Sequence, residues 1–284
     1  MNPGRRKVLL LGGEGFVGRN IATLFSSEWD CFSVGEQQSP FLERADTFIQ
    51  ANPYQEVIPN TYEAIMHLID LKFSPPELIQ QEQKLIENLG INERNHLIVF
   101  SSAVVYANPD SPYGLRKRAL EKFYHTFCKE KNIRLTLVRP FNLYGPFQIP
   151  CRQGSLVANL IYNHLTATPT EINDMEAKRD FLFVGDLARM VRHLLKERQE
   201  GIYDVGSGKF TSIRALVAIL EEKVFKEKMQ VIQKNSKDLS KDRVAEGDVL
   251  ERISMLSLEE GLTSTLDFYK KNISLIKDCI TSGK

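Results

Sequence analysis

The strongest constraint on the fold is an apolar run that leads directly into spaced glycines. Residues 7–11 (KVLLL) have the length and composition of a buried strand, and GGEGFVG follows them. The first glycine can make a tight turn, the second lets a diphosphate approach the backbone, and the third permits close packing of a helix. The segment predicts a dinucleotide-binding strand–turn–helix unit, with a purely structural glycine turn as the alternative. The candidate pyrophosphate contacts are Gly12, Gly15, Phe16, Val17 and Gly18.

Strands and helices alternate along the first half of the chain. Helices are predicted at 16–27, 74–90 and 113–131, and strands at 31–34, 64–69, 96–102 and 134–140. This alternation predicts an α/β fold with a Rossmann-like, doubly wound parallel sheet.

Beyond residue 145 the pattern loosens, and the chain is expected to form a smaller C-terminal α/β substrate lobe. Short strands are expected near 170, in RDFLFV and in IYDV, with helices at 155–165, 185–197, 212–227 and 258–271. We predict a dinucleotide-binding domain of residues 1–145 with 180–206, and a substrate-binding lobe of residues 146–179 and 207–284.

Composition excludes several classes of function. A formal net charge of +1 gives no electrostatic basis for binding nucleic acid or an anionic membrane. No apolar stretch is long enough to span a membrane, and the N-terminal apolar run is too short for a signal peptide. The histidines show no metal-ligand spacing, and Cys31, Cys128, Cys151 and Cys279 form no CxxC motif. We therefore expect a cytoplasmic protein with reduced thiols and no metal site.

Tyr113 and Lys117 stand four residues apart at the start of the predicted helix 113–131, and so share one face of it. Tyrosine is a poor base because its pKa is about 10, but a neighbouring ammonium group favours the phenolate. Such a tyrosine can exchange a proton with a hydroxyl while a hydride moves at the carbon, and Ser102 can hydrogen-bond the same oxygen. The alternative for Tyr-x-x-x-Lys alone is an ordinary surface helix.

The choice between NAD and NADP stays open in the sequence. An acidic residue at the end of the second strand binds the adenine-ribose hydroxyls in dinucleotide folds, and Glu36 occupies that place. If Glu36 points away, Arg19 or Arg44 could hold a 2′-phosphate.

Eight motifs in order resemble the extended short-chain dehydrogenases/reductases, in the NAD(P)-dependent group that modifies nucleotide sugars. They run from residue 8 to about 270 and are GGEGFVG, AIMHLI, FSSAVVY, YGLRK, RPFNLYGP, RDFLFVGDLA, YDVGSG and SLEEGL.

The resemblance implies roles for individual residues. Ser102 matches the catalytic Ser/Thr, Tyr113 the catalytic acid/base, and Lys117 the lysine that holds the nicotinamide ribose. It also implies that the Leu68 and Pro140 backbones line the cofactor. Asn142 and Arg179 resemble residues that hold the substrate diphosphate, although Arg179 could be a plain surface arginine beside Asp180.

Three departures from the family pattern indicate a trimmed site. The loop between Tyr106 and Tyr113 is short, which is expected to open the substrate side. The region between 34 and 64 is predicted to lack the third strand and its Asp motif, and Leu78 replaces an asparagine of the helix 75–89.

The resemblance and these departures favour a 4-keto-sugar reductase. Ala103 and Val104 stand where dehydratases of the family carry an Asp-Glu pair. Epimerase-reductases acting at C3 and C5 use a cysteine and a histidine that are not matched, with only Cys151 lying in the relevant loop. A nucleotide-sugar 4-epimerase and a non-catalytic dinucleotide-binding relative remain the alternatives.

The family commonly dimerises through helices that correspond to 75–89 and 113–131. We therefore expect a homodimer, in which the apolar side chains of Phe123, Tyr124 and Phe127 could take part or could instead be core.

Overall fold

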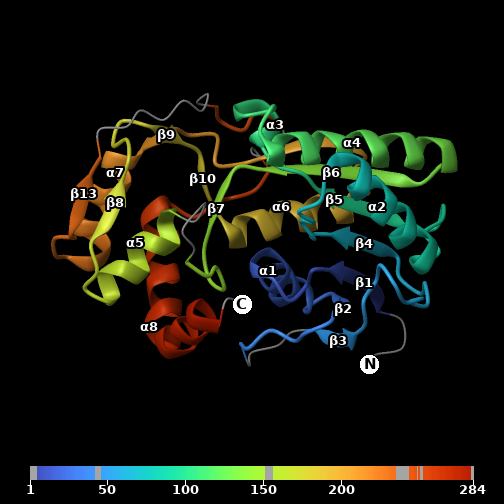
Figure 1. Ribbon diagram of the computed structural model, residues 1–284, viewed down its shortest axis with the longest axis horizontal. Helices are drawn as coiled ribbons and strands as arrows, with labels where there is room; N and C mark the ends of the chain where they lie inside the picture. Colours follow the sequence, from blue (N-terminus) through green and yellow to red (C-terminus); the bar gives the residue numbers. More distant parts are fainter. Residues whose placement is uncertain are drawn as a thin grey trace. The chain divides into compact units, whose positions relative to one another are not determined.

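The computed structural model describes residues 5–41, 46–150, 156–234, 243–247, 249 and 252–282 (Figure 1). The chain forms two compact units, each described by itself below. Unit 1 comprises Met1–Pro140 and Ala188–Val205, and unit 2 comprises Phe141–Leu187 and Gly206–Lys284. The assignment of cofactor binding to one part and substrate binding to the other stays a prediction.

A parallel sheet of seven strands forms the centre of unit 1, in the order β11-β6-β5-β4-β1-β2-β3. The chain begins in the middle with β1, builds outward through β2 and β3, and then returns to the other side of β1 with β4. The strands are β1 (Arg6–Leu11), β2 (Trp29–Gly35), β3 (Thr47–Gln50), β4 (Ala64–His67), β5 (His96–Phe100), β6 (Arg134–Pro140) and β11 (Gly201–Val205).

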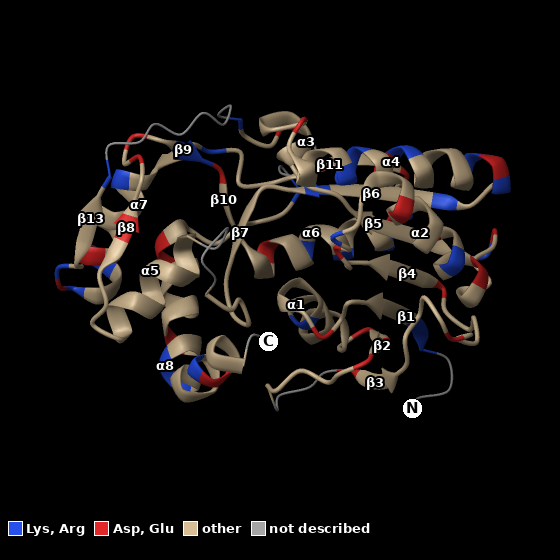
Figure 2. Cartoon of the chain, in the orientation of Figure 1, with Lys and Arg blue, Asp and Glu red and all other residues tan. Residues whose placement is uncertain are grey.

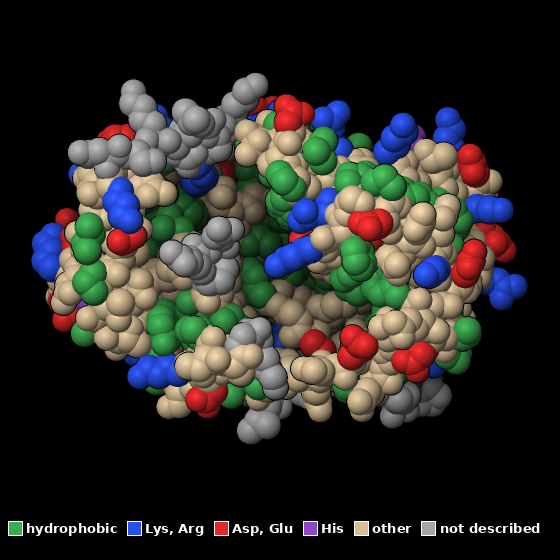
Figure 3. All heavy atoms as spheres, viewed as in Figure 1, with side chains coloured by type: hydrophobic (Ala, Val, Ile, Leu, Met, Phe, Trp, Pro, Cys, Tyr) green, Lys and Arg blue, Asp and Glu red, His purple; other side chains and the backbone are tan. Residues whose placement is uncertain are grey.

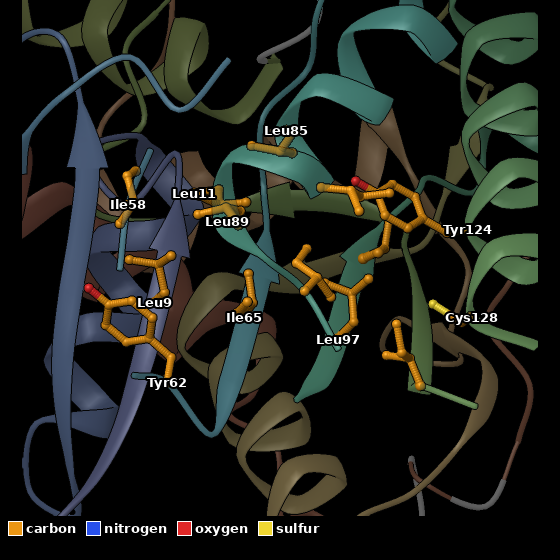
Figure 4. Packing of buried hydrophobic residues seen from close by; sticks show 14 of the residues in the cluster. Leu9, Leu11, Ile58, Tyr62, Ile65, Leu85, Leu89, Leu97, Tyr124 and Cys128 are labelled. Atoms are coloured by element: carbon orange, nitrogen blue, oxygen red, sulfur yellow. The ribbon is translucent and has the colours of Figure 1, made fainter. Parts of the chain in front are cut away.

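Helices α2 (Pro75–Leu89) and α4 (Pro112–Lys131) cover one face of this sheet. Figure 4 shows how buried side chains from β1, β4, β5, α2 and α4 pack together there. Helix α1 (Phe16–Phe25) packs on β1 and β2. The chain adds strands first on one side of β1 and then on the other. Because crossovers between parallel strands are right-handed, this change of direction places α1 and α2 on opposite faces of the sheet. A sheet covered on both faces explains why its strands read as continuous apolar runs.

Capping residues mark the ends of α2 and the start of α4. Ser74 and Glu77 form a capping box at the start of α2, and Gly90 ends the helix in the left-handed conformation, with a φ of 56°. Ser111 caps α4 by accepting a hydrogen bond from the Gly114 N–H at 3.0 Å.

The predicted absence of a third strand is wrong. Strand β3 pairs in parallel with β2, with Phe32 opposite Thr47 and Gly35 opposite Gln50. It is a four-residue edge strand, too short to show a period in sequence. This removes the missing strand from the reasons for expecting a trimmed site, while the missing Asp motif stays a prediction.

The described residues of unit 2 form three small two-stranded sheets. Its strands are β7 (Asn142–Tyr144) with β10 (Phe181–Phe183), β9 (Lys178–Arg179) with β12 (Thr211–Ser212), and β8 (Thr170–Ile172) with β13 (Val231–Gln233). Its helices include α5 (Leu156–Leu165), α7 (Ile213–Ile219) with a π-helical continuation over Leu220–Phe225, and α8 (Leu258–Ser282). The last helix was predicted to end near 271, where Asn272 has non-helical angles, but it resumes beyond that kink. Helix α6 (Val184–Lys196) begins in unit 2 and continues in unit 1.

Candidate active site

Five neighbouring strands bring the predicted cofactor and catalytic positions of unit 1 to one edge of the sheet. Pro140 ends β6, Ser102 follows β5, Leu68 follows β4, the glycine loop follows β1, and Glu36 follows β2. Because the strands are parallel, all these positions lie at the carboxyl edge. Ligands of open α/β sheets bind at that edge where the strand order reverses, here between β1 and β4.

The glycine loop has the geometry of a diphosphate cradle. Gly12 turns with a φ of 83°, and a Cβ on Gly18 would lie 2.5 Å from the Gly13 Cα. Gly15 begins α1 without a side-chain cap. A Cβ on Gly15 would meet the Gly12 oxygen at 3.4 Å and no other described atom within 4 Å. The first-turn N–H groups of α1 have no partner within the helix, so the loop fits the diphosphate of a dinucleotide.

The backbone around Ser102 is held at the end of β5. The Val104 N–H donates to Ser102 Oγ at 3.2 Å, and the Ala103 N–H donates to the Pro140 carbonyl at 3.0 Å. Since Ser102 Oγ accepts this bond, its own O–H proton can still be donated to a ligand oxygen.

Tyr113 and Lys117 lie in the first two turns of α4, as predicted. Lys117 is 4% exposed, and its Nζ lies 5.6 Å from the centre of the Tyr113 ring. The ammonium donates to the Phe100 carbonyl at 3.2 Å and lies 3.3 Å from Asp70 Oδ1. No sequence motif singled out Asp70, although Asp70 directly follows the AIMHLI segment.

The short connection before α4 approaches the helix closely. A Cβ on Gly114 would lie 2.3 Å from the Asn108 carbonyl oxygen and 2.7 Å from that of Pro109. Glycine at this position therefore permits the shortened loop to pass over the first turn of the helix that carries Tyr113.

Two carboxylates lie near the end of β2, where the adenine ribose is expected. Glu36 accepts a hydrogen bond from Asn52 Nδ2 at 3.2 Å. Glu14, within the glycine loop, accepts from Ser33 Oγ at 2.6 Å and from the Ser39 N–H at 2.5 Å. No sequence motif singled out Glu14. Of the two arginines considered for a 2′-phosphate, Arg19 is 5% exposed on α1 and Arg44 lies outside the described residues.

Asn142 and Arg179 belong to unit 2. There Asn142 lies close to Asp180, the residue that follows Arg179 in the chain. The Asn142 N–H and Nδ2 both donate to the Asp180 carbonyl, at 3.0 and 3.1 Å. The buried Asp180 carboxylate accepts hydrogen bonds from Ser207, Gly208 and Ala245, which fixes the local backbone.

A buried polar cluster connects β4, α2 and α4. Glu82 Oε2 contacts His67 Nε2 at 2.8 Å and accepts from the Tyr124 hydroxyl at 2.6 Å. Burial is the largest effect on the pKa of Glu82 and raises it, but His67, Tyr124 and Lys117 together lower that pKa below its ordinary value.

The apolar side chains offered as a possible dimer contact belong to the core. Tyr124 is fully buried, and Phe123 and Phe127 pack against the same cluster. Figure 2 shows Lys and Arg at several places along α4, and Figure 3 shows Lys and Arg side chains on the surface of the same view. The exposed residues of α4 include Arg118 and Lys122, together with Leu115. The homodimer stays a prediction, without support from these aromatic residues.

Other predicted features concern metals, thiols and membranes. No cluster of metal-ligating side chains occurs among the described residues. The thiols of Cys31, Cys128 and Cys279 are buried, while Cys151 lies outside the part of the chain that the structure describes. Burial is the main cause that raises the pKa of both Cys31 and Cys128 to about 12, which makes these thiols unreactive. No helix in the described ranges is long and apolar enough to cross a membrane.

Known proteins are similar to this chain in sequence. UDP-glucuronate 4-epimerase of Thermodesulfobacterium geofontis (strain OPF15) is 28% identical over 216 residues, which cover 68% of this chain and 64% of that protein. The match therefore spans slightly less than two thirds of that relative's length. The dTDP-4-dehydro-6-deoxyglucose reductase of Escherichia coli is 24% identical over 269 residues, covering 80% of this chain and 84% of the reductase.

A solved structure confirms the predicted fold class. MoeE5 in complex with UDP-glucuronic acid and NAD has a TM-score of 0.77 and 21% identity, covering 94% of this chain and 99% of that one. The family model for the NAD dependent epimerase/dehydratase family matches residues 8–206, which include every strand of the central sheet from β1 residue Val8 onward. The chain therefore belongs to the NAD-dependent epimerase/dehydratase family.

Proposed function

We propose that this protein is an NAD-dependent oxidoreductase that reduces the 4-keto group of a nucleotide-activated sugar. The observation that carries the proposal is the common position of Ser102, Tyr113 and Lys117, at the same sheet edge as the diphosphate cradle.

The roles follow from the chemistry of each side chain. The bound cofactor in its reduced form supplies the hydride that the sugar carbon C4 receives. Tyr113 donates its phenolic proton to the carbonyl oxygen, which becomes a hydroxyl, and solvent then returns a proton to the tyrosine. Ser102 donates a hydrogen bond to the same oxygen and polarises the carbonyl. Lys117 would hold the nicotinamide ribose.

The trimmed site favours reduction over epimerisation. An epimerase must keep its cofactor bound through a full cycle, whereas a reductase exchanges it at every turnover, and tighter retention requires more contacts. The connection between Tyr106 and Tyr113 is short, and Leu78 stands where the family pattern has an asparagine. Ala103 and Val104 provide no acid or base beside Ser102, which argues against dehydration.

The carboxylates near the end of β2 favour NAD over NADP. Glu36 can accept hydrogen bonds from ribose hydroxyls, and Glu14 adds a second negative charge close to the same strand end. Both would repel a 2′-phosphate. We expect Arg179 and Asn142 to bind the substrate's diphosphate, for which a guanidinium group is well suited.

A spectroscopic assay tests the proposal. Purified protein is incubated with NADH or NADPH and nucleotide-activated 4-keto-6-deoxy sugars, and the loss of nicotinamide absorbance is followed. Tyr113→Phe should lower kcat by about 10²- to 10⁴-fold while NADH affinity stays nearly unchanged. Turnover close to wild type in this variant would refute the assignment.

The same preparation separates the two alternatives. The name of the first relative supports a 4-epimerase, which would interconvert UDP-glucuronate and its C4 epimer without net consumption of cofactor. Dinucleotide binding with no redox change in any nucleotide sugar would indicate a non-catalytic relative.

A further inference from the structure

A third polar residue, Glu121, continues the face of α4 that carries Tyr113 and Lys117. Tyr113, Lys117 and Glu121 stand at every fourth position, so their side chains project from neighbouring turns of one helix face. Glu121 is only 9% exposed. Among the described residues, no hydrogen bond or ion pair joins Glu121 to the diphosphate cradle or to Tyr113, and the proposed reaction gives it no role.

The Glu121 carboxylate is bound from two directions. Arg139 donates hydrogen bonds to both of its oxygens, with Nε 2.8 Å from Oε1 and one terminal nitrogen 2.5 Å from Oε2. Ser101 Oγ donates to Oε1 at 2.5 Å. Two parallel bonds from a guanidinium to a carboxylate fix orientation as well as distance. The hydrogen bond to Glu121 is the main cause that raises the pKa of Arg139.

Both partners of Glu121 are immediate neighbours of predicted site residues. Ser101 precedes Ser102 at the end of β5, and Arg139 precedes Pro140 at the end of β6. The backbones of these strand ends are joined in turn, since the Ser101 N–H donates to the Val138 carbonyl at 2.8 Å. Glu121 therefore connects the helix that carries Tyr113 to the strand end that carries Ser102.

Arg139 also holds the shortened connection between Ser102 and Tyr113. One of its terminal nitrogens donates to the Tyr106 hydroxyl, and its guanidinium lies 4.9 Å from the centre of the Tyr106 ring. The Tyr106 hydroxyl donates to Asp204 Oδ1 at 3.0 Å. The connection, the catalytic helix and two strands thus converge on one guanidinium group.

We propose that Glu121 and Arg139 are positioning residues that set the separation and orientation of Tyr113 relative to Ser102. The pair acts through the backbone of α4 and the ends of β5 and β6, without touching substrate. Its catalytic consequence rests on the proposed function. Proton transfer and hydride transfer demand close alignment, and a misplacement of about 1 Å can cost on the order of 10²-fold in rate.

A double variant separates positioning from stability. Removing one partner would leave a buried charge, so a single variant could simply unfold. Replacing a buried ion pair by apolar side chains of similar volume is often neutral for stability. In Glu121→Leu/Arg139→Met we therefore expect an unfolding midpoint near that of wild type, kcat lowered by about 10-fold or more, and KM changed by less than about 3-fold.

Two further variants calibrate this result. Ser101→Ala removes only the bond beside Ser102, and should lower kcat less than the double variant does. Glu28→Gln alters an ion pair elsewhere in unit 1, with Lys196 and Arg192, and should leave kcat unchanged. A folded double variant with the kcat of wild type would overturn the proposal.

Hydrogen exchange provides a readout that does not need turnover. We expect deuterium uptake by the peptide spanning Tyr113–Leu120 to be faster in the double variant than in wild type and Glu28→Gln. Unchanged uptake there would count against the positioning role even if kcat fell. If wild type reduces no nucleotide sugar, the proposed function fails, while this exchange experiment still decides whether the pair holds the start of α4.

Discussion

Side chains join β5 and β6 at both ends of this strand pair, and the two junctions differ in character. At the carboxyl end, Glu121 and Arg139 form a charged, bidentate pair beside Ser102. At the amino end, His96 Nε2 contacts Thr136 Oγ1 at 2.7 Å, and that hydroxyl donates to the Gln199 carbonyl at 2.5 Å. The junction at the carboxyl end depends on two charged side chains, whereas the junction at the amino end depends on an uncharged imidazole.

Because of this difference, the two ends should respond differently to acid and to the loss of a charged side chain. Because the Thr136 hydrogen is used on Gln199, the neutral His96 ring donates through Nε2, and its Nδ1 has no partner among the described residues. A proton on Nδ1 would place an uncompensated charge in a buried site. At the opposite end the guanidinium stays charged at every working pH. Acid should therefore weaken the amino end through His96, whereas loss of one charge should weaken the carboxyl end.

The largest predicted effect comes from breaking the charged junction on one side. Arg139→Met leaves the Glu121 carboxylate buried without its counter-charge, so the free energy of unfolding should fall by about 3 to 5 kcal/mol. Urea unfolding monitored by circular dichroism measures this, with Glu121→Leu/Arg139→Met as the compensated control. A single variant as stable as the double variant would show that the charge is solvated despite its low exposure.

Acid titration tests the neutral junction. Burial, followed by the charge of Arg134, lowers the pKa of His96 from 6.5 to about 4, while the Gln199 backbone opposes the shift. A depressed pKa in the folded state contributes stability that is complete above pH 6.5 and is lost as the pH falls toward about 4. The loss attributable to His96 should reach about 3 kcal/mol.

Comparison with His96→Gln isolates this contribution, because glutamine can donate to Thr136 and does not titrate. The difference in unfolding free energy between wild type and variant should change with pH between 6.5 and 4. A pH-independent difference would contradict the assignment of a neutral, buried imidazole.

The sequence predicted the part of the molecule whose signals are local. Five strands, the helices between them and the glycine loop follow from apolar runs, caps and turn residues, and β6 was predicted at its observed bounds. The positions at the carboxyl edge followed because parallel strands align their ends. In contrast, β3 was missed because a four-residue edge strand carries no readable period.

Side-chain pairing was beyond the reach of sequence patterns. Glu121 and Arg139 are 18 residues apart on different elements, and each resembles an ordinary surface charge in the printed sequence. Tyr124 was considered for an interface, but its hydroxyl has a buried acceptor in Glu82, which lies 42 residues away. Such partners depend on which helix faces which strand, and no single-sequence period records that.

A smaller effect is expected where the carboxyl edge depends on backbone packing rather than on charge. A Cβ in Gly18→Ala would lie 2.5 Å from the Gly13 Cα and 2.7 Å from two carbonyl oxygens, so the loop must shift. We expect a loss of about 1 to 3 kcal/mol in unfolding free energy, and weaker NADH binding by fluorescence titration. Gly35→Ala provides the stability control, because its Cβ would meet nothing closer than 3.8 Å. Equal stabilities of the two variants would show that the loop relaxes freely.

The smallest effect should come from an ion pair that is charged but exposed. Glu28 precedes β2 at the amino side of the sheet, where its carboxylate lies 2.5 Å from Lys196 Nζ and 3.4 Å from an Arg192 nitrogen. The Glu28 side chain is 33% exposed and that of Lys196 is 44% exposed, so water and salt screen both charges. Glu28→Gln should therefore change the unfolding free energy by less than about 1 kcal/mol, and about 0.5 M NaCl should remove most of that change. A loss as large as that of Arg139→Met would mean that charge alone accounts for the effect, without burial or bidentate geometry, and the contrast between the two ends would fail.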